Sequence, residues 1–376
     1  MSILDHIILF LILFTSFFLM TRINQSTINK YYWHIVLVPI ILYSLILGCR
    51  YGWGNDYLWY KYRFEHPFGY ENESPGFRFI NMMIATLGGS YVCAFIVYSL
   101  AFIVCVYSLL KLYRDNKYMI FLFLPATLLF STYTIRQSFA ESFVYLAFVF
   151  FFKKEWLFMG LMLIVASSIH IAALLPFILY IILYFITSKP FPIKYTIPIY
   201  ILMFVFTSVF SEIVLQGLND ILPYISLDNK YQGYIDGADR WFNNEAQNSI
   251  YEQSSLTSFL MFGFHLSMIY TGYVILRKIP QGTITIFYNM LVISLIFLKL
   301  FFELEILRRI AESCVQLYFI PIGFVFYHVF LSYKTPRSMQ MKLSKYASWY
   351  IIFYLILYFG RFIFLSPHYQ FYWNII

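Results

Sequence analysis

Charge is scarce in this sequence. Only 12% of its 376 residues are charged and 61% are hydrophobic, whereas about 25% of the residues of an ordinary soluble domain are charged. A chain of this composition has too few ionised side chains to present a polar surface to water. The composition therefore excludes a water-soluble fold.

The sequence also lacks the common catalytic and nucleotide-binding motifs. It holds no P-loop, no HExxH or DxD metal motif, no GxSxG elbow and no run of carboxylates within an apolar segment. These absences disfavour nucleotide-driven enzymes and the common hydrolase classes. We expect neither a metal nor another cofactor.

Cysteine is rare, with four residues in the chain. Cys49, Cys93, Cys105 and Cys314 lie in or beside apolar runs, with no CxxC pair and no nearby histidine at metal-ligand spacing. We expect them to be buried as small apolar side chains. A disulfide between Cys49 and Cys93 is the alternative.

Long apolar runs are what the sequence has in abundance. Segments near the spanning length of about 20 residues recur from one end to the other, separated by short polar connections. The chain is predicted to be an all-α polytopic membrane protein with about twelve transmembrane helices, in a single transmembrane domain over residues 1–376. The predicted spans are 4–20, 33–49, 91–110, 118–134, 137–152, 156–169, 171–187, 195–212, 256–276, 283–302, 310–332 and 346–365.

Lysine and arginine are distributed unevenly between the connections. With these spans, the basic connections all fall on one side, which must be cytoplasmic, and this bias explains most of the net charge of +8 without a nucleic-acid partner. The opposite side receives both termini and two long acidic segments, 50–90 and 213–255. The basic residues concerned are Arg22, Lys30, Lys111, Arg114, Lys117, Lys153, Lys154, Lys189, Lys194, Arg277, Lys278, Lys334, Arg337, Lys342 and Lys345.

Two apolar stretches depart from a simple span. Residues 77–87 are too few to cross the bilayer, so we predict a re-entrant or interfacial helix there. Residues 156–187 would make one helix of roughly 48 Å, against a hydrocarbon core of about 30 Å. A break at residues 167–170 is therefore predicted, and it places His170 at the outer face.

The outer end of the second predicted span carries a glycine-rich turn followed by aromatics. Arg50 precedes Gly52 and Gly54, which permit a tight turn, and Asp56 is expected to cap the next segment. Residues 57–64, which include Tyr57 and Tyr60, alternate aromatic and basic side chains. They are either an interfacial anchor at the lipid headgroups, or a surface that stacks on sugar rings while Asp56 accepts a sugar hydroxyl.

Polar residues within or beside the later spans are candidates for chemistry. Arg136 either reaches out to the lipid headgroups or faces a polar cavity. Gln137 and Glu141 are four residues apart and share one helical face. Lipid offers such a polar face no hydrogen-bond partners, which favours the cavity. His170 is either a cap at a helix break, or a base or phosphate-facing donor.

The densest group of charges lies between two later spans. It consists of Glu303, Glu305, Arg308, Arg309 and Glu312. If this stretch is helical, acidic and basic residues three or four positions apart could pair and neutralise one another's charges. Two adjacent arginines point to different faces, however, so at least one could turn toward an anionic ligand. Lys299, just before the group, could line the same anion-binding surface as these arginines and is a weaker candidate.

The order of these motifs resembles the EpsG-like group of Wzy-type polysaccharide polymerases. The resemblance covers nearly the whole chain, and Asn55 stands where threonine would be expected. The residues that carry it are Gly54-Asn55-Asp56-Tyr57 with Tyr60, Arg136-Gln137 opening a span, His170 ending another, and the basic pair at Arg308.

The resemblance implies an enzyme that joins oligosaccharide repeat units carried on undecaprenyl diphosphate. The reaction would take place at the outer face of the bacterial plasma (inner) membrane, for O-antigen, capsule or exopolysaccharide. A chain-length regulator protein is a candidate partner in addition to the lipid bilayer and the lipid-linked oligosaccharide.

Such a transfer needs cations for the departing diphosphate and an acceptor for the proton of the attacking hydroxyl. Arg136, Arg308 and Arg309 are the predicted diphosphate clamp, and either His170 or Asp56 is the base. The mechanism requires these groups to meet in one water-accessible hollow. The further residues predicted to bind substrate are Gln137, Glu141, Glu305, Arg50, Tyr57 and Tyr60.

Two other functions compete with this interpretation. A flippase or transporter of lipid-linked glycans would share arginines and aromatics, but its charged groups should line a path through the bilayer. A membrane acyltransferase that modifies polysaccharides would use a histidine, but it would receive its acyl donor from the cytoplasmic side, opposite the predicted position of His170.

Overall fold

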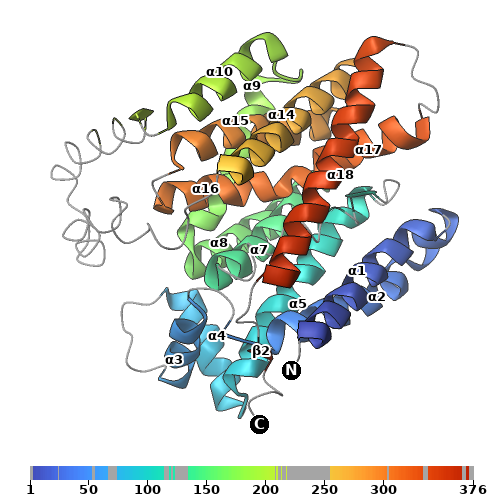
Figure 1. The fold of residues 1–376 in the computed structure, drawn as a ribbon. Coiled ribbons are helices and arrows are strands. Elements are labelled where there is room, and N and C mark those ends of the chain that lie inside the picture. Colours follow the sequence, from blue (N-terminus) through green and yellow to red (C-terminus); the bar gives the residue numbers. More distant parts are fainter. Residues whose placement is uncertain are drawn as a thin grey trace. The chain divides into compact units, whose positions relative to one another are not determined.

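The computed structural model of the protein is built of helices, apart from one pair of two-residue strands among the residues it describes. This confirms the predicted all-α polytopic class (Figure 1). The structure describes residues 3–23, 25–52, 56–66, 74–113, 118–119, 122, 134–207, 209–210, 213, 217, 255–302, 305–332, 338–365 and 370–371.

The chain divides into two compact units. The first comprises Met1–Ile178 and Leu355–Ile376, and the second comprises Leu179–Tyr354. The boundaries fall inside two helices, α9 (Leu175–Ile186) and α18 (Met339–Leu365). The single domain over residues 1–376 stays a prediction.

The first unit is organised around four helices that pack in succession, α2 on α5, α5 on α7 and α7 on α8. A buried hydrogen bond joins the first two, where the Tyr32 hydroxyl donates to the Tyr107 carbonyl at 2.7 Å. The elements of this unit are α1 (Ile3–Arg22), α2 (Gln25–Gly48), β1 (Arg50–Tyr51), α3 (Tyr57–Glu65), α4 (Pro75–Thr86), α5 (Tyr91–Leu110), η1 (Lys111–Tyr113), α7 (Ile135–Phe152), α8 (Trp156–Ile169), η2 (Ile171–Leu174), the start of α9, the end of α18 and β2 (Gln370–Phe371).

The second unit is organised around α15, which packs against α10, α14, α16 and α17. The buried Asn289 on α15 satisfies backbone groups of the α9–α10 connection: its Nδ2 donates to the Lys189 carbonyl at 2.8 Å, and its Oδ1 accepts from the Phe191 amide at 2.9 Å. The elements are the end of α9, α10 (Ile193–Val205), α14 (Ser255–Lys278), α15 (Gly282–Leu300), α16 (Glu305–Val315), η5 (Gln316–Tyr318), α17 (Phe319–Tyr327), the π-helical turn η6 (His328–Ser332) and the start of α18.

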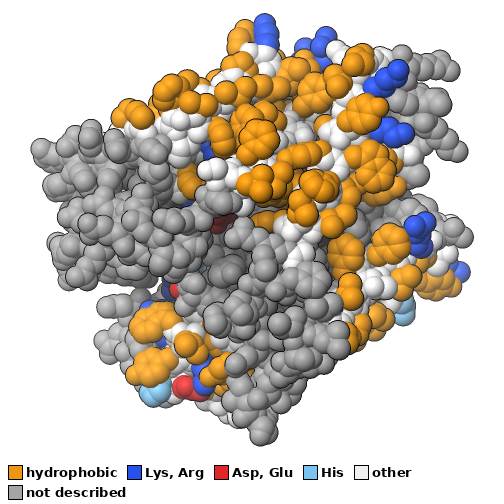
Figure 2. All heavy atoms as spheres, in the orientation of Figure 1, with side chains coloured by type: hydrophobic (Ala, Val, Ile, Leu, Met, Phe, Trp, Pro, Cys, Tyr) orange, Lys and Arg blue, Asp and Glu red, His pale blue; other side chains and the backbone are white. Residues whose placement is uncertain are grey.

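The length and hydropathy of each helix indicate whether it can cross a membrane. Six helices among the described residues are long and apolar enough to cross a bilayer, and four shorter apolar helices accompany them. They coincide with predicted spans, whereas the predicted span 118–134 lies almost wholly outside the described residues. The six are Ser26–Gly48, Tyr91–Tyr113, Ile135–Phe152, Ser255–Lys278, Gly282–Leu300 and Leu307–Phe330. Hydrophobic side chains also cover wide areas of the visible surface (Figure 2).

Both departures from a simple span have the predicted helical form. Helix α8 ends at Ile169, His170 adopts an extended conformation (φ −158°, ψ 108°), and η2 starts the next helix. The break at His170 is thus confirmed. The short helix predicted at 77–87 is α4, of 12 residues; its re-entrant or interfacial position stays a prediction.

The cysteine prediction is wrong in one respect. Cys105 and Cys314 are buried, but Cys49 is half-buried and Cys93 is exposed. Cys93 lies in the first turn of α5 between the buried Val92 and Ala94, so it projects from the opposite side of the helix. All four thiols are free, so the alternative disulfide is not formed.

Several basic connections lie at one end of the second unit. The Lys278 ammonium, at the end of α14, donates to the Ser338 hydroxyl before α18 at 3.4 Å. Asn289 holds the connection that contains Lys189. Asn289 lies in the first half of α15, and α15 begins a short turn after Lys278. This arrangement is what the predicted sidedness requires of the second unit.

Close packing of α14 on α15 gives a first prediction. A Cβ added at Gly272 would collide with the Tyr288 ring, whose hydroxyl donates to the Ile269 carbonyl at 2.7 Å. We expect Gly272→Ala to lower the free energy of unfolding by about 1–3 kcal/mol, measured by denaturation of the purified protein in detergent micelles. Gly160→Ala is the control, since nothing lies within 4 Å of that position; equal effects of the two variants would contradict the close contact.

Candidate functional site

A buried guanidinium lies at the end of α2. Arg50 is only 2% exposed, and its Nη1 donates to the Leu47 carbonyl, one of the acceptors that the end of the helix leaves open. Its Cζ lies 5.7 Å from the centroid of the Phe95 ring. Burial lowers the pKa of Arg50 from 12.5 to about 10, so the side chain stays cationic at neutral pH.

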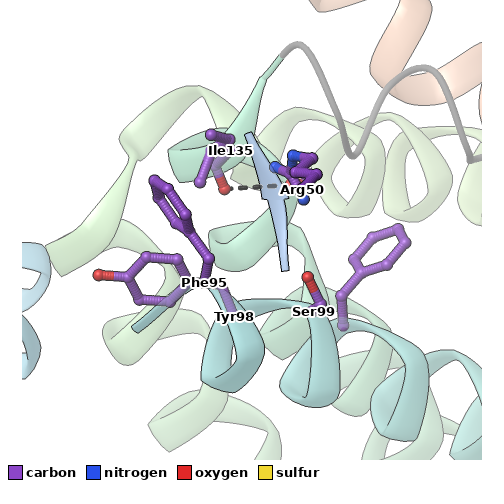
Figure 3. Close-up of a pocket in the computed structure, with 7 residues that line it drawn as sticks. Arg50, Phe95, Tyr98, Ser99 and Ile135 are labelled. Carbon is purple, nitrogen blue, oxygen red and sulfur yellow. Dashed lines mark hydrogen bonds between the residues drawn. The ribbon is translucent and has the colours of Figure 1, made fainter. Parts of the chain in front are cut away.

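Arg50 borders a small pocket between α5 and α7 (Figure 3). Figure 3 shows the carbonyl of Ile135, in the first turn of α7, pointing toward the Arg50 guanidinium. The pocket has room for about one water molecule, so it cannot hold a sugar ring. Its lining residues are Arg50, Phe95, Tyr98, Ser99, Phe102, Ile135 and Ser138.

Helix α7 carries a row of buried polar side chains inside an apolar span. Glu141 is 0% exposed; its Oε1 accepts from Gln137 Nε2 at 3.1 Å, and its Oε2 accepts from the Tyr145 hydroxyl at 3.5 Å. Gln137 is buried as well. The shared face of Gln137 and Glu141 is therefore turned into the protein and not toward lipid.

Arg136 begins this row. The residue is half-buried, and its buried Nε has no hydrogen-bond partner among the described residues. A guanidinium has five N–H donors, so Arg136 retains capacity to bind an anion.

The α7–α8 hairpin brings His170 toward the same end. Helix α8 follows α7 after a turn at 153–155 and packs along it, and η2 also contacts α7. The C-terminal end of α8 thus returns to the N-terminal half of α7, where Arg136 lies. Gly76 of α4 contacts Ser168 at this end of α8. The first unit therefore collects Arg50, Arg136 and His170 at one end of its helices.

Asp56 stands before the first turn of α3, as predicted, but it does not cap the helix. Its side chain makes no capping hydrogen bond, because its backbone (φ −94°, ψ 1°) lacks the extended conformation that turns a side chain toward the first amides. The predicted capping role is wrong. The glycine turn predicted before it lies partly outside the described residues, although Gly52 has the positive φ of 71° that such a turn uses.

Helix α3 has two different aromatic faces. Tyr57, Tyr60 and Phe64 are buried; the Tyr57 ring lies 4.9 Å from Phe95, and burial raises the pKa of its hydroxyl. Their spacing of three and four places them on one side of the helix. The ring faces of Tyr57 and Tyr60 are thus covered by protein, which speaks against stacking of sugars on these two residues.

The exposed face of α3 carries Trp59 and Tyr62 instead. Their rings are stacked with centroids 6.5 Å apart and an interplanar angle of 16°, and the Arg63 Cζ lies 4.5 Å from the Trp59 ring. The sequence analysis grouped these two rings with the other aromatics of residues 57–64 and did not separate the two faces. The helical spacing of Tyr57, Tyr60 and Phe64 could have shown that Trp59 and Tyr62 lie on the opposite face.

The charge cluster of the second unit is partly neutralised. Arg308 Nε lies 3.4 Å from Glu312 Oε1, which is the spacing-of-four pair considered above. Arg308 is buried and Arg309 is half-buried. The backbone of Glu305 begins α16, but its side chain lies outside the described residues, as does all of Glu303. Because Arg136 and these arginines belong to different units, their common hollow stays a prediction.

Sequence reasoning missed a buried polar pair in the second unit. The Tyr200 hydroxyl of α10 lies 2.8 Å from His265 Nδ1 of α14, and both side chains are buried. A histidine within the apolar span 255–278 is the feature that could have pointed to it. No group of three or more potential metal-binding side chains occurs in the part of the chain that the structure describes.

The chain matches a known protein family over most of its length. The model of the EpsG family matches residues 33–374. The chain belongs to the EpsG family. EpsG proteins are Wzy-like polysaccharide polymerases, so this chain is a polymerase-type membrane protein of polysaccharide biosynthesis, and the resemblance found in the sequence is confirmed. No curated protein and no solved structure matches the chain.

The α7 row gives a second prediction. Glu141→Ala would remove the acceptor of the Gln137 and Tyr145 hydrogen bonds, and we expect it to lower the free energy of unfolding by about 1–3 kcal/mol. Glu155→Ala is the matched control, because Glu155 is exposed and makes no side-chain capping bond. Thermal unfolding of both variants in detergent measures the difference; a Glu141→Ala protein as stable as the control would show that the row contributes nothing to folding.

Proposed function

We propose that this EpsG protein joins oligosaccharide repeat units carried on undecaprenyl diphosphate, at the outer face of the bacterial plasma membrane. Family membership supplies the reaction class. The observation that carries the finer assignment is the polar row of α7, where Arg136 opens a membrane-spanning helix and the Gln137–Glu141 pair is buried behind it.

The reaction defines what the site must provide. A hydroxyl oxygen of the acceptor unit forms a bond to the anomeric carbon of the donor glycan. The bond from that carbon to the diphosphate oxygen breaks, its electron pair leaves with the lipid diphosphate, and the hydroxyl proton passes to a base. Cationic donors stabilise the negative charge that develops on the leaving group, and the base raises the reactivity of the hydroxyl.

Arg136 is the proposed diphosphate ligand of the first unit. Its half-buried position and the open donor capacity of its guanidinium support the assignment. The roles of Gln137 and Glu141 follow from this, since their hydrogen-bonded pair fixes the first turns of α7 beneath the arginine. Arg50, buried beside the same helix end, adds positive charge there.

His170 and Asp56 remain the two candidates for the base. His170 is supported by its place at the break after α8, at the Arg136 end of the hairpin. Asp56 is supported by its place at the start of α3, next to the exposed Trp59 and Tyr62, which we propose as the rings that contact the glycan.

Arg309 and Arg308 are proposed to contribute cationic groups from the second unit. Arg308 lies 3.4 Å from Glu312 and is buried, and Arg309 beside it is half-buried. A chain-length regulator protein is a proposed partner of the whole enzyme.

A transporter of lipid-linked glycans is less well supported. It should carry charged groups along a path through the bilayer. In the first unit the candidate groups instead gather at one end of the helices, as the α7–α8 hairpin and the Arg50 pocket show. This distribution favours chemistry at one face over passage through the unit.

Replacement of the arginines tests the proposal in cells. We expect Arg136→Ala to reduce polymerisation on the order of a hundredfold, the usual effect of removing one charge-stabilising donor, so that single lipid-linked repeat units accumulate. Arg136→Lys should retain part of the activity because it keeps the charge. Arg309→Ala is expected to act in the same direction.

Gel analysis of glycan chain length reads out each variant. Lys153→Ala is the matched control, since Lys153 is an exposed cation at the other end of α7, and it should leave chain length unchanged. Undiminished long chains in both arginine variants would remove these residues from the site.

A further inference from the structure

A lysine is buried at the end of a membrane-spanning helix of the second unit. Lys299 is 3% exposed and lies in the last turn of α15. Its Nζ lies 5.1 Å from the centroid of Phe204 and 4.7 Å from that of Phe302. The two aromatic faces offset part of the cost of removing the charge from water.

The ammonium has no hydrogen bond or ion pair with any residue that the structure describes. A lysine ammonium has three N–H donors, and leaving all three without acceptors inside a membrane protein is expensive. Such residues mark ligand or ion sites by default. A negatively charged hydrogen-bond acceptor is therefore expected at this position.

The Tyr200–His265 pair is linked to this lysine through α10. Phe204, whose ring centroid lies 5.1 Å from Lys299 Nζ, follows Tyr200 by about one helical turn, and the charge of Lys299 acts on His265. The Tyr200 hydroxyl lies 2.8 Å from His265 Nδ1. With the phenol donating to Nδ1, the proton of the imidazole is on Nε2, and that N–H is a further donor in the cluster.

The three residues come from helices that pack on one another. Tyr200 is on α10, His265 on α14 and Lys299 on α15, and each pair of these helices is in contact. Lys299 follows Asn289 by ten residues, roughly 15 Å along the helix axis, and Asn289 holds the lysine-bearing connection at the other end. By the predicted sidedness, Lys299 thus lies toward the outer leaflet.

We propose that Lys299, with the oriented His265, binds a phosphate group at this depth, and that the group belongs to the lipid diphosphate of the substrate. A compact ammonium is a common phosphate ligand. No carboxylate among the described residues pairs with Lys299, whereas Arg308, which lies over the same Phe302 ring at 5.9 Å, is paired with Glu312. The inference rests on the proposed function and names a substrate-binding residue for it.

Binding of a short prenyl diphosphate to the purified full-length protein tests this site. Geranylgeranyl diphosphate is titrated into the protein in detergent, with the shift in unfolding temperature as the readout. Lys299→Met should weaken binding about tenfold or more, as expected for the loss of a charge-assisted hydrogen bond, whereas Lys299→Arg should retain most of it. Tyr200→Phe should weaken binding less, because it only frees the orientation of His265.

Lys194→Met is the matched control. Lys194 belongs to the same unit and lies 4.7 Å from the Tyr195 ring, but it is exposed. Its replacement should leave binding unchanged. Equal binding by wild type and Lys299→Met would overturn the proposal.

Two further measurements separate the alternatives. Lys299→Met should be as stable as wild type or more so, because a buried cation without a protein partner is removed. Lower stability, matched by Glu303→Gln, would show that Glu303 is the partner and overturn the site.

Competition with phosphatidylglycerol distinguishes the source of the phosphate. Displacement of the prenyl diphosphate only at large excess supports the substrate. Displacement at equal concentration assigns the site to a membrane lipid and overturns the substrate assignment.

The readouts also separate this inference from the proposed function. Loss of diphosphate binding is measured on the isolated protein, and chain length is measured in cells with the Arg136 variants. If Lys299→Met binds normally while Arg136→Ala blocks polymerisation, only the Lys299 site fails. If Lys299 binds the diphosphate but no variant alters the polymer, the site stands and the proposed function fails.

Discussion

The hydrocarbon of a bilayer offers no hydrogen-bond partners, and the first unit depends on how Glu141 meets that constraint. A carboxylate without exposure inside a spanning helix is tolerated only when its oxygens are occupied. Gln137 and Tyr145, one turn to either side, supply donors from the same helix. The α7 helix can therefore carry polar side chains into the protein while α5 and α8 cover it. Arg136, at the start of the row, is left with donors for a ligand.

The second unit meets the same constraint with pairs that join different helices. Asn289 closes the α9–α10 connection onto α15, and Tyr200 reaches His265 across the α10–α14 contact. Each pair fixes the position of two segments as well as satisfying polar groups. Lys299 differs from these two pairs, since its described neighbours offer aromatic faces but no acceptor. A buried ammonium in that position carries a full charge, which makes the missing acceptor informative.

The sequence predicted the features that the thickness of the bilayer dictates. The length of an apolar run decides whether a segment spans, so the break at His170 and the short helix α4 could be derived by counting residues. The Gln137–Glu141 face followed from helical periodicity in the same way. Features that depend on neighbouring segments were not predicted in this way: the burial of Tyr57 and Tyr60 requires α5 and α4 beside α3, and the Tyr200–His265 contact joins residues 65 positions apart. The backbone angles of Asp56, which decide against capping, likewise do not follow from its residue type.

The strand pair of the first unit links distant parts of the chain. Arg50 and Tyr51 pair antiparallel with Phe371 and Gln370, so the segment after α18 supplies the backbone that fixes the residue with the buried guanidinium. Shortening the chain before residue 370 would release Arg50 from this pairing, although the cut lies more than 300 positions away in sequence.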